Sequence, residues 1–547
     1  MRGFFQKILI FILFTSITTA SSKVDFSEDK INKFDKRIEH AMEKLKAPGC
    51  SVVVVDKDKA LYQKSFGKCR KNGKNIDAKT IFPISSLTKT VTAIIVGKLV
   101  DEGVINFDDQ VRQYLPNFFI ANEDISSKFT IRDLISHRSG FKNFLRNDLW
   151  SAGYSKDQII ESLRYVSNVD GFRKKYGYQN VVYGIIEDVI VKATGLSYDD
   201  LVEKYITIPM NLDATSTKPL IIQRSFIENF KYNRKNHGFW YAAKNPFNLE
   251  KSKNISSTHT TYYDEIIELP PNDFFQRIKA TAGINMSADN LGEFLRMCLR
   301  NGAYDSKTTI ISKDTFAELT SNQIELKNIK DDDCTFPKNR LTEIHYGMGF
   351  FNAKYSDEGK NDRRILFHMG GIYGVSNFFA ISPSDNIAIG VLCNLGGTDR
   401  TLFSELICWE FFDIYFGYKS YDWTQLELDN NKKINEQKIS YHKNISEKNP
   451  SPHENFELYT GTYNSVIYGD ITVTINNDGE LEISNGIRKT KISHVNGNIF
   501  GYEALSMGES FFDRKEYVVF YKGGGENFDS LYISQFHEDG TLFAKKI

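Results

Sequence analysis

Cysteine is scarce in this chain of 547 residues, and its six cysteines include no Cys-x-x-Cys pair. Structural zinc sites depend on such spacing and disulfide scaffolds on many cysteines, so we expect neither. The chain also lacks net charge, because 69 Lys and Arg residues balance 69 Asp and Glu residues. Since nucleic-acid surfaces are built from clustered basic side chains, we expect no nucleic-acid partner.

Long apolar runs are missing after the first twenty residues. No later segment approaches the ~18 apolar residues that a membrane-spanning helix requires, so we expect no stable membrane span in the mature protein. The composition is otherwise ordinary for a globular protein, with 41% hydrophobic and 25% charged residues. At about 150 residues per domain, the length allows two to four domains.

The first twenty residues have the pattern of a secretory signal peptide. Arg2 and Lys7 precede the apolar run at 8–14, and small residues follow it at 18–20. This order of charged, apolar and small residues is typical of a cleaved signal. We therefore predict a signal peptide over 1–20 and a secreted or periplasmic (extracytoplasmic) protein; an uncleaved N-terminal anchor is the alternative.

Two segments near the C-terminus differ from the rest of the chain. Residues 421–455 are polar, charged and poor in apolar periodicity, which predicts a linker. Beyond it apolar and polar residues alternate, as at 471–476, and Asn-Gly and Asp-Gly pairs typical of hairpin turns follow at 496–497 and 539–540. We therefore predict a small antiparallel β-domain, a barrel or a sandwich, over 456–547.

Residues 25–420 combine helix and strand patterns. Helical patterns dominate 86–210, and strand-like runs flank them on both sides, at 51–55, 60–62, 375–381 and 387–392. Strands at both ends with helices between them predict one α+β domain, whose sheet is assembled from distant segments.

The pattern Ser-x-x-Lys carries the most informative chemistry. On a helix its two side chains share one face, so the amine can remove the proton of the hydroxyl. The pattern begins at five serines: Ser27, Ser65, Ser86, Ser139 and Ser440. Only Ser86 opens an apolar helix, where burial would lower the pKa of Lys89 and let it act as a base. By itself, however, a serine at a helix start is more often an N-cap.

Two further patterns favour the catalytic interpretation. Tyr178 and Asn180 form the only Tyr-x-Asn of the chain, just before a helical run. His368-Met-Gly-Gly371 leads into a strand-like run, whereas His345-x-Gly347 lacks such a strand. Each residue also has an ordinary interpretation: Lys89 as a surface amine, Tyr178 as core, Asn180 as a helix cap and His368 as a hydrogen-bonded histidine at a strand end.

The ordered set Ser-x-x-Lys, Tyr-x-Asn, His-x-Gly resembles the serine β-lactamase and penicillin-binding-protein superfamily, in particular its class C β-lactamase, D-Ala-D-Ala carboxypeptidase and D-aminopeptidase branch. The resemblance covers roughly residues 30–417 and includes four further segments, 82–90, 131–140, 282–287 and 346–350. It implies a β-lactamase-like antiparallel sheet flanked by helices, with a helical subdomain. The tail, with Tyr459-Thr-Gly-Thr-Tyr463, is similar to the lipocalin-like domain of some members.

The resemblance implies a two-step acyl transfer without a metal or cofactor. In that mechanism Ser86 would be the nucleophile, Lys89 its base and Tyr178 the proton relay to the leaving group. The resemblance also implies a substrate-binding role for Asn180, His368, Gly370 and Gly371. It implies an oxyanion hole formed by the N–H groups of Ser86 and Gly371.

Some positions depart from the family pattern. His368 replaces the lysine of true β-lactamases, and a histidine is mostly neutral near pH 7. We therefore predict weak β-lactamase activity and a preference for substrates without a free carboxylate. Gln179 replaces the usual Ser, and Asp170 stands where Pro is common. Residues 218–275 are predicted to be an insertion near the cleft mouth that could set specificity.

The chain is thus predicted to be a secreted serine hydrolase that acts on peptide or small-molecule substrates, D-amino-acid amides and esters included. The alternatives are a catalytically silent binding protein of the same fold, a carboxylesterase, and a lipid or glycan carrier role in the C-terminal β-domain. Ser384-Asp-Asn386 resembles a class A motif but follows the third motif, so we predict a hairpin turn there. Pairing of Cys50 with Cys69 is left open.

Overall fold

The computed structural model describes residues 26–166, 171–217, 254–262, 265–269, 277–327, 336–372, 374–396, 402–445, 450–503, 515–524, 527–534, 536 and 542–546. The expected signal peptide at 1–20 lies outside these residues, as do Asp170 and most of the expected insertion at 218–275.

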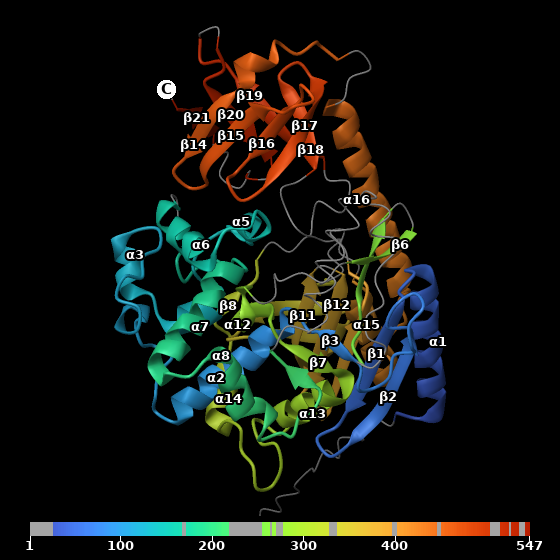
Figure 1. Ribbon diagram of the computed structural model, residues 1–547. Coiled ribbons are helices and arrows are strands. Elements are labelled where there is room, and N and C mark those ends of the chain that lie inside the picture. The colour runs from blue at the N-terminus through green and yellow to red at the C-terminus, as the bar shows by residue number, and fades with distance from the viewer. Residues whose placement is uncertain are drawn as a thin grey trace, which may run out of the picture.

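An antiparallel sheet of eight strands forms the centre of the larger part of the molecule (Figure 1). Its strand order is β2 (Ala60–Gly67), β1 (Gly49–Val55), β13 (Ile387–Cys393), β12 (Val375–Ser382), β11 (Lys360–Ile372), β10 (Phe351–Asp357), β9 (Leu341–Tyr346) and β8 (Ile324–Glu325). The N-terminal strands therefore pair with the C-terminal ones, as expected. Val52 lies opposite Val391 in this register.

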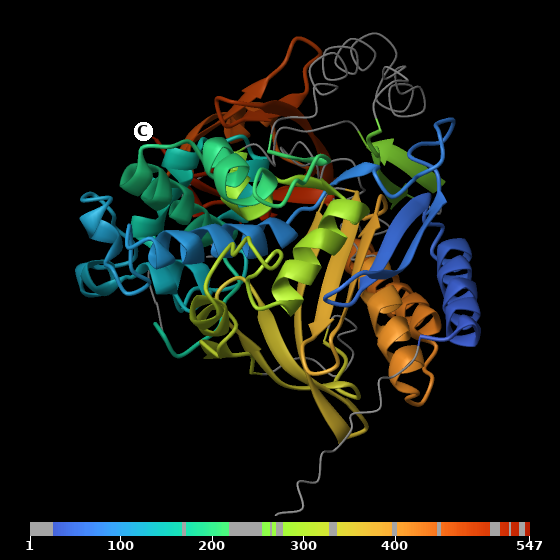
Figure 2. The same cartoon turned by 90° about the horizontal axis from the view of Figure 1, so that it is seen from below.

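Helices cover both faces of the sheet (Figure 2). On one face lie α1 (Glu28–Lys44) and α15 (Phe403–Phe416), and on the other α13 (Ala288–Leu299) and α2 (Leu87–Asp101). Alternate residues of β1 belong to the two hydrophobic cores that result: Val53 to the core with α13 and Val52 to the core with α15. Burial on both faces explains the unbroken valine run of this strand.

A helical subdomain packs beside the sheet. It contains α3 (Glu123–Lys128), α4 (Ile131–Ile135), α5 (Asn147–Ser151), α6 (Lys156–Ser162), α7 (Asn180–Thr194) and α8 (Tyr198–Val202), with short turns at Val111–Gln113, Leu163–Tyr165 and Glu203–Thr207. Capping boxes begin α4, α6 and α8, at Thr130, Ser155 and Ser197. These local signals set where each helix begins.

Smaller elements link the subdomain to the sheet. A three-stranded sheet joins β3 (Ile81–Pro83), β7 (Asn285–Ser287) and β4 (Thr215–Ser216). Two short helices, α12 (Lys279–Ala282) and α14 (Lys313–Leu319), pack against α2. A separate hairpin, β5 (Thr258–Tyr262) with β6 (Glu265–Leu269), lies against the β11–β12 turn, because His259 N–H donates to Gly374 O at 3.0 Å. This hairpin and residues 254–257 before it are the described part of the expected insertion.

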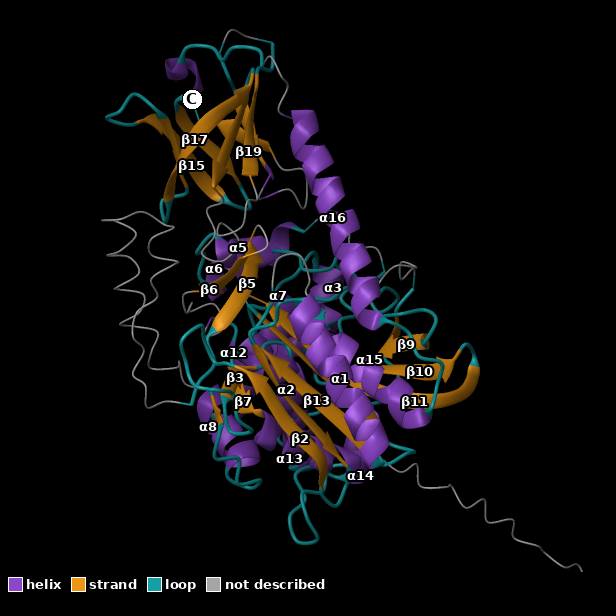
Figure 3. Ribbon diagram, turned by 90° about the vertical axis from the view of Figure 1, so that its right-hand side faces the viewer, coloured by secondary structure: helices purple, strands orange, loops and turns teal. Residues whose placement is uncertain are grey.

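The segment expected as a polar linker is largely helical. Residues Trp423–Ile445 form α16, which rises from the main body toward the C-terminal part (Figure 3). Its first turn is anchored by Trp423, which is fully buried and donates from Nε1 to Asp413 Oδ2 at 3.0 Å. The sequence pattern missed this helix because 423–445 shows no apolar stripe; the described side chains that are buried, Trp423, Thr424 and Glu427, all lie in its first turns.

Eight antiparallel strands close into a barrel at the C-terminal end. They are β14 (Gly461–Ser465), β15 (Gly469–Ile475), β16 (Leu481–Ser484), β17 (Lys489–Asn496), β18 (Ile499–Glu503), β19 (Lys515–Tyr521), β20 (Ser530–Ile533) and β21 (Leu542–Lys545), preceded by a 3-10 turn at Phe456–Tyr459. The predicted α+β fold with an appended small antiparallel β-barrel is thus confirmed.

Aromatic side chains pack together inside the described part of this barrel. The Tyr459 ring lies 4.4 Å from Phe528, 4.9 Å from Phe520 and 5.0 Å from Phe500 between centroids. An eight-stranded barrel is only wide enough for side chains or one small ligand.

Across the described helices, none combines the length and apolar character that a membrane span requires.

Candidate active site

Ser86 stands at the junction between β3 and α2. It is the residue before the first helical residue, yet its side chain makes no capping bond within the described part of the chain. Its backbone is already helical, with φ −66° and ψ −7°, whereas an N-cap is usually extended. The preceding Ser85 has φ 49°, a left-handed conformation that is costly for a residue with a Cβ. The N-cap interpretation of Ser86 is therefore not supported by its geometry.

Lys89 lies one turn further along α2 and is fully buried. Three oxygens lie within hydrogen-bond distance of its Nζ: Asn180 Oδ1 at 2.7 Å, Ser86 Oγ at 3.1 Å and Thr281 O at 3.3 Å. All three acceptors are neutral, so nothing in this set compensates a positive charge. Burial lowers the pKa of Lys89 well below its usual value. Lys89 is therefore no surface amine, and its neutral form is favoured.

Tyr178 and Asn180, at the start of α7, both lie beside Lys89. The Tyr178 side chain lies near that of Ser86, and its ring centroid lies 4.8 Å from Lys89 Nζ. Burial raises the pKa of Tyr178, so the phenol keeps its proton. Asn180 is the first residue of α7 and not its cap, which is Gln179, and its side chain is used for the bond to Lys89.

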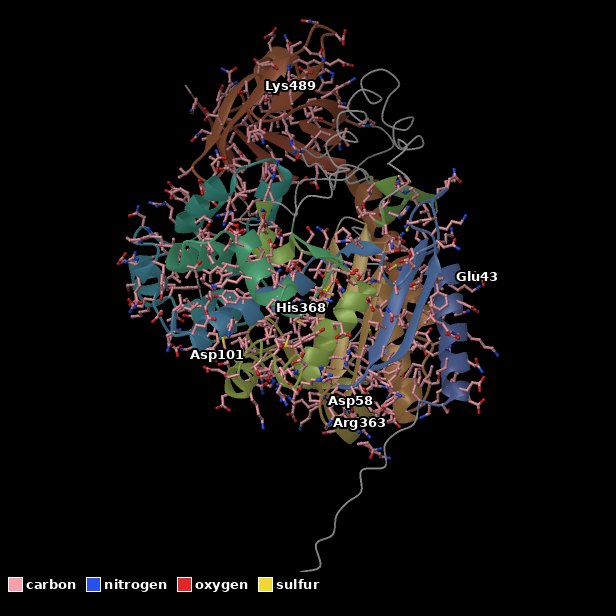
Figure 4. All side chains as sticks on the ribbon, turned by 60° about the horizontal axis from the view of Figure 1, so that its bottom comes forward. Glu43, Asp58, Asp101, Arg363, His368 and Lys489 are labelled. Carbon is pink, nitrogen blue, oxygen red and sulfur yellow. The ribbon has the colours of Figure 1, made fainter. Side chains whose placement is uncertain are left out.

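His368 lies on β11 in the interior of the molecule, between the sheet and the helices (Figure 4). Its Nδ1 is 2.7 Å from Met369 O, and its Nε2 is 3.1 Å from the hydroxyl of Tyr346. Burial lowers the pKa of His368 to about 3. The imidazole is therefore neutral at physiological pH: Nδ1–H donates to the carbonyl and Nε2 accepts from Tyr346.

Gly370 and Gly371 lie where one edge of β11 opens. Strand β10 pairs with β11 only up to Phe367. Beyond Phe367, β12 is the partner of β11 among the described strands. A Cβ on Gly370 would lie 2.4 Å from Ile84 O, so only glycine allows β11 to approach the start of α2 this closely. Gly371 is exposed at this edge, and its Cβ position meets Val375 O at an ordinary 3.7 Å.

Two aromatic residues complete the site without having been singled out from the sequence. His137 is buried, its Nδ1 accepts from the Gln179 N–H at 3.1 Å, and its ring centroid lies 4.3 Å from that of Tyr178. Tyr346 lies 4.6 Å from the His137 ring and bonds His368. Both belong to segments that resemble the superfamily, 131–140 and 346–350, and this was the available signal.

The other copies of each motif lie elsewhere. Ser65 on β2 is hydrogen-bonded to Ser51 at 2.8 Å, and His345 Nδ1 is 2.8 Å from Glu343 O. Ser384-Asp-Asn386 forms the turn between β12 and β13, as predicted, with Asn386 at φ 53°. The five cysteines that the structure describes are all unbridged, so Cys50 and Cys69 do not pair; Cys50 lies opposite Cys393.

Metal ligands are not gathered in the described ranges, where no three His, Cys, Asp or Glu side chains form a group that could hold an ion.

Solved structures with the same overall arrangement are known. An octameric penicillin-binding protein homologue from Pyrococcus abyssi aligns with a TM-score of 0.55 at 18% identity, covering 92% of this chain and 98% of the other. SurE with D-Leu aligns with a TM-score of 0.51 at 15% identity, covering 95% and 100%. These similarities show the fold.

Sequence comparisons point the same way. Protein flp of Staphylococcus aureus (strain NCTC 8325 / PS 47) is 23% identical over 390 residues, 68% of this chain and 64% of its own length. The chain therefore spans less than two thirds of that relative. Unguisins hydrolase ungD' of Aspergillus campestris (strain IBT 28561) is 27% identical over 203 residues, 36% of this chain and 38% of its own length. The sequence profile described as Beta-lactamase matches residues 34–405. Because this match spans most of the chain, the protein belongs to the Beta-lactamase family, whose members are generally serine hydrolases.

Proposed function

We propose that this protein is an exported serine hydrolase that cleaves peptide amides or esters through an acyl-enzyme on Ser86. The observation that carries this proposal is the environment of Lys89: a fully buried amine, 3.1 Å from Ser86 Oγ, whose three acceptors are all neutral. A silent binding protein would gain nothing from burying this amine, since a buried cation without a charged partner costs stability.

In the first step Ser86 Oγ attacks the substrate carbonyl carbon, and its proton passes to Lys89 Nζ. The tetrahedral intermediate collapses as the bond from carbon to the leaving nitrogen or oxygen breaks. The leaving group takes the proton from Lys89 through the hydroxyl of Tyr178, whose ring centroid lies 4.8 Å from Lys89 Nζ. Lys89 is then neutral again, and the acyl group is an ester of Ser86.

In the second step water attacks the ester carbonyl and gives a proton to Lys89. The bond between the carbonyl carbon and Ser86 Oγ breaks, and Ser86 recovers its proton from Lys89. The product is a carboxylic acid, and the protein returns to its starting state without a metal or cofactor in any step.

Backbone N–H groups of Ser86 and Gly371 would stabilise the oxyanion. Hydrogen-bonded and non-hydrogen-bonded pairs alternate along an antiparallel ladder, and Ile372 pairs with Val375 at the end of the β11–β12 hairpin. In a two-residue hairpin this closing pair is the hydrogen-bonded one, so Gly371 directs its N–H away from β12, toward the open edge. Losing one such donor typically costs ~10²–10³ in rate.

The substrate class follows from the charge at His368. A neutral imidazole tied to Tyr346 and to its own strand offers no cation to a substrate carboxylate. We therefore propose esters, amides and peptides without a free C-terminal carboxylate as substrates, D-amino-acid derivatives included. One of the similar solved structures is that of SurE with D-Leu, which makes D-amino-acid residues a first choice for screening. The leader-like residues 1–20 support export.

A fluorophosphonate probe tests the nucleophile. We expect the probe to label the full chain and Ser86→Ala to abolish labelling. Ser65→Ala is the matched control, because Ser65 also begins a Ser-x-x-Lys but lies on β2. Labelling that survives Ser86→Ala would overturn the proposal, as would labelling that Ser65→Ala removes.

A further inference from the structure

The barrel contacts the hydrolase part through two turns that meet the α5 region. The Tyr468 hydroxyl accepts from Arg146 Nη1 at 3.0 Å, and the Tyr154 hydroxyl donates to Tyr468 O. Asn485 Nδ2 donates to Ala152 O at 3.1 Å. These bonds join the β14–β15 and β16–β17 turns of the barrel to the segment that carries α5, as the nearness of the two parts in Figure 1 also shows.

Arg146 and Tyr468 are both buried at this contact. Arg146 is fully buried at the start of α5, with φ 68°, and its guanidinium lies 5.5 Å from the Tyr468 ring centroid. Tyr468 is also buried, and its ring stacks on Phe536 inside the barrel at 4.7 Å. Tyr468 is therefore rigidly held by the barrel core, while its polar end reaches the hydrolase domain. A long side chain in a left-handed backbone persists only where its surroundings hold it.

The residues just before Arg146 hold Tyr178 on both sides. Asn143 Oδ1 accepts from the Tyr178 N–H at 2.7 Å, and Phe144 N–H donates to Tyr178 O at 2.7 Å. The rings of Phe144 and Tyr178 lie 5.4 Å apart. One residue, Leu145, thus separates this clamp on Tyr178 from Arg146, which the barrel contacts.

We propose that the barrel is a positioning element for Tyr178: Tyr468 and Tyr154 fix the segment 143–146, and this segment fixes the tyrosine that delivers the proton to the leaving group. The inference rests on the proposed function of Tyr178. Small displacements of a catalytic group reduce rates strongly, because its geometry must be set before the reaction begins. Tyr468 and Tyr154 are positioning residues, since neither contacts Ser86 or Lys89 among the described contacts.

The test compares two substrates that share one acyl group, a p-nitroanilide and a p-nitrophenyl ester. Their deacylation is identical, but only the anilide needs a proton delivered to its leaving group, because p-nitrophenolate leaves without one. We expect the double variant Tyr154→Phe, Tyr468→Phe to lower kcat/KM for the anilide about tenfold and for the ester less than about twofold. In a Tyr178→Phe background the same pair of changes should have no further effect on the anilide.

Tyr463→Phe is the matched control. It also removes a buried tyrosine hydroxyl from the barrel, one that donates to Tyr459 O at 2.8 Å, without touching the hydrolase domain. We expect Tyr463→Phe to leave kcat/KM for both substrates unchanged. Fluorophosphonate titration of Ser86 in the full-length protein normalises every rate to the amount of folded enzyme.

The outcomes separate the two proposals. If the double variant lowers kcat/KM equally for both substrates, or for neither, the barrel does not act through Tyr178 and the inference is wrong. If Tyr178→Phe itself leaves the ratio of anilide to ester turnover unchanged, the relay role of Tyr178 is wrong, and the inference is overturned with it. A selective loss in the double variant that persists in the Tyr178→Phe background would likewise contradict the inference.

Discussion

Asn180 Oδ1 accepts a hydrogen bond of 2.7 Å from Lys89 Nζ, although 91 residues separate the two in sequence. The bond joins the start of α2 to the start of α7, and thereby the first motif to the second. It also gives the amine a neutral partner where a carboxylate would have stabilised the charged form. A Lys beside a carboxylate stays protonated, whereas here the amine can accept a proton from Ser86.

The pH profile of the reaction should report this environment. Lys89 is active when neutral, and burial lowers its pKa, so kcat/KM should rise as pH rises through that lowered pKa. His368, with a pKa lowered to about 3, should add no transition between pH ~5 and ~8. A profile for a neutral ester measured between those limits and up to pH ~10 checks this. A rate still climbing at the usual pKa of a lysine would contradict it.

The neutral His368 predicts discrimination between charged and uncharged substrates. A peptide ester and its free C-terminal acid differ by one carboxylate, which has no cation to pair with at this position. We expect the ester to be turned over with a kcat/KM roughly tenfold or more above the acid, since a charge-assisted bond is worth about 1.5–3 kcal/mol. Equal turnover of the two, or fast penicillin hydrolysis, would refute the prediction.

Gly370 and Gly371 should differ in their tolerance of a side chain. A Cβ on Gly370 would lie 2.4 Å from Ile84 O, whereas one on Gly371 meets its nearest neighbour at 3.7 Å. We expect Gly370→Ala to lower the free energy of unfolding by about 1–3 kcal/mol because backbone must move, and Gly371→Ala to change it by less than ~0.5 kcal/mol. Urea unfolding measures both. Similar losses in the two variants would show that β11 does not approach α2 this closely.

Glu410 on α15 predicts a pH-dependent stability. It is buried, its carboxylate lies 3.5 Å from Arg37 Nε, and burial raises its pKa to about 7 from 4.5. The folded state therefore holds a proton that the unfolded state releases. The stabilisation is complete below pH 4.5 and is lost as pH rises toward 7.

Glu410→Gln should remove this dependence. We expect it to raise the free energy of unfolding by about 1–3 kcal/mol at pH ~8 and by much less at pH ~5. Urea unfolding at the two pH values measures the difference, and Glu43→Gln, an exposed position on α1, is the control. A variant that is no more stable at the higher pH would show that the attraction of Arg37 outweighs the burial of the carboxylate.

Local chemistry determined much of what could be predicted. The valine run at 52–55, the apolar helix after Ser86 and the alternation at 471–476 set strands and helices, because periodicity depends on neighbours in sequence. The order of the three motifs selected Ser86, Lys89, Tyr178, Asn180, His368, Gly370 and Gly371, which the structure places around one site. The helix α16 escaped prediction because its sequence, which is polar and charged, shows no apolar stripe.

Tertiary structure decided what these residues can do. The carbonyl of Thr281 and the amide of Asn180 surround Lys89, Tyr346 holds His368, and Tyr468 of the barrel reaches Arg146. None of these contacts has a local signature, since each joins segments far apart in the chain. Burial and pKa depend on every segment packed around a group. The protonation states of the motif side chains are therefore set only in the folded chain.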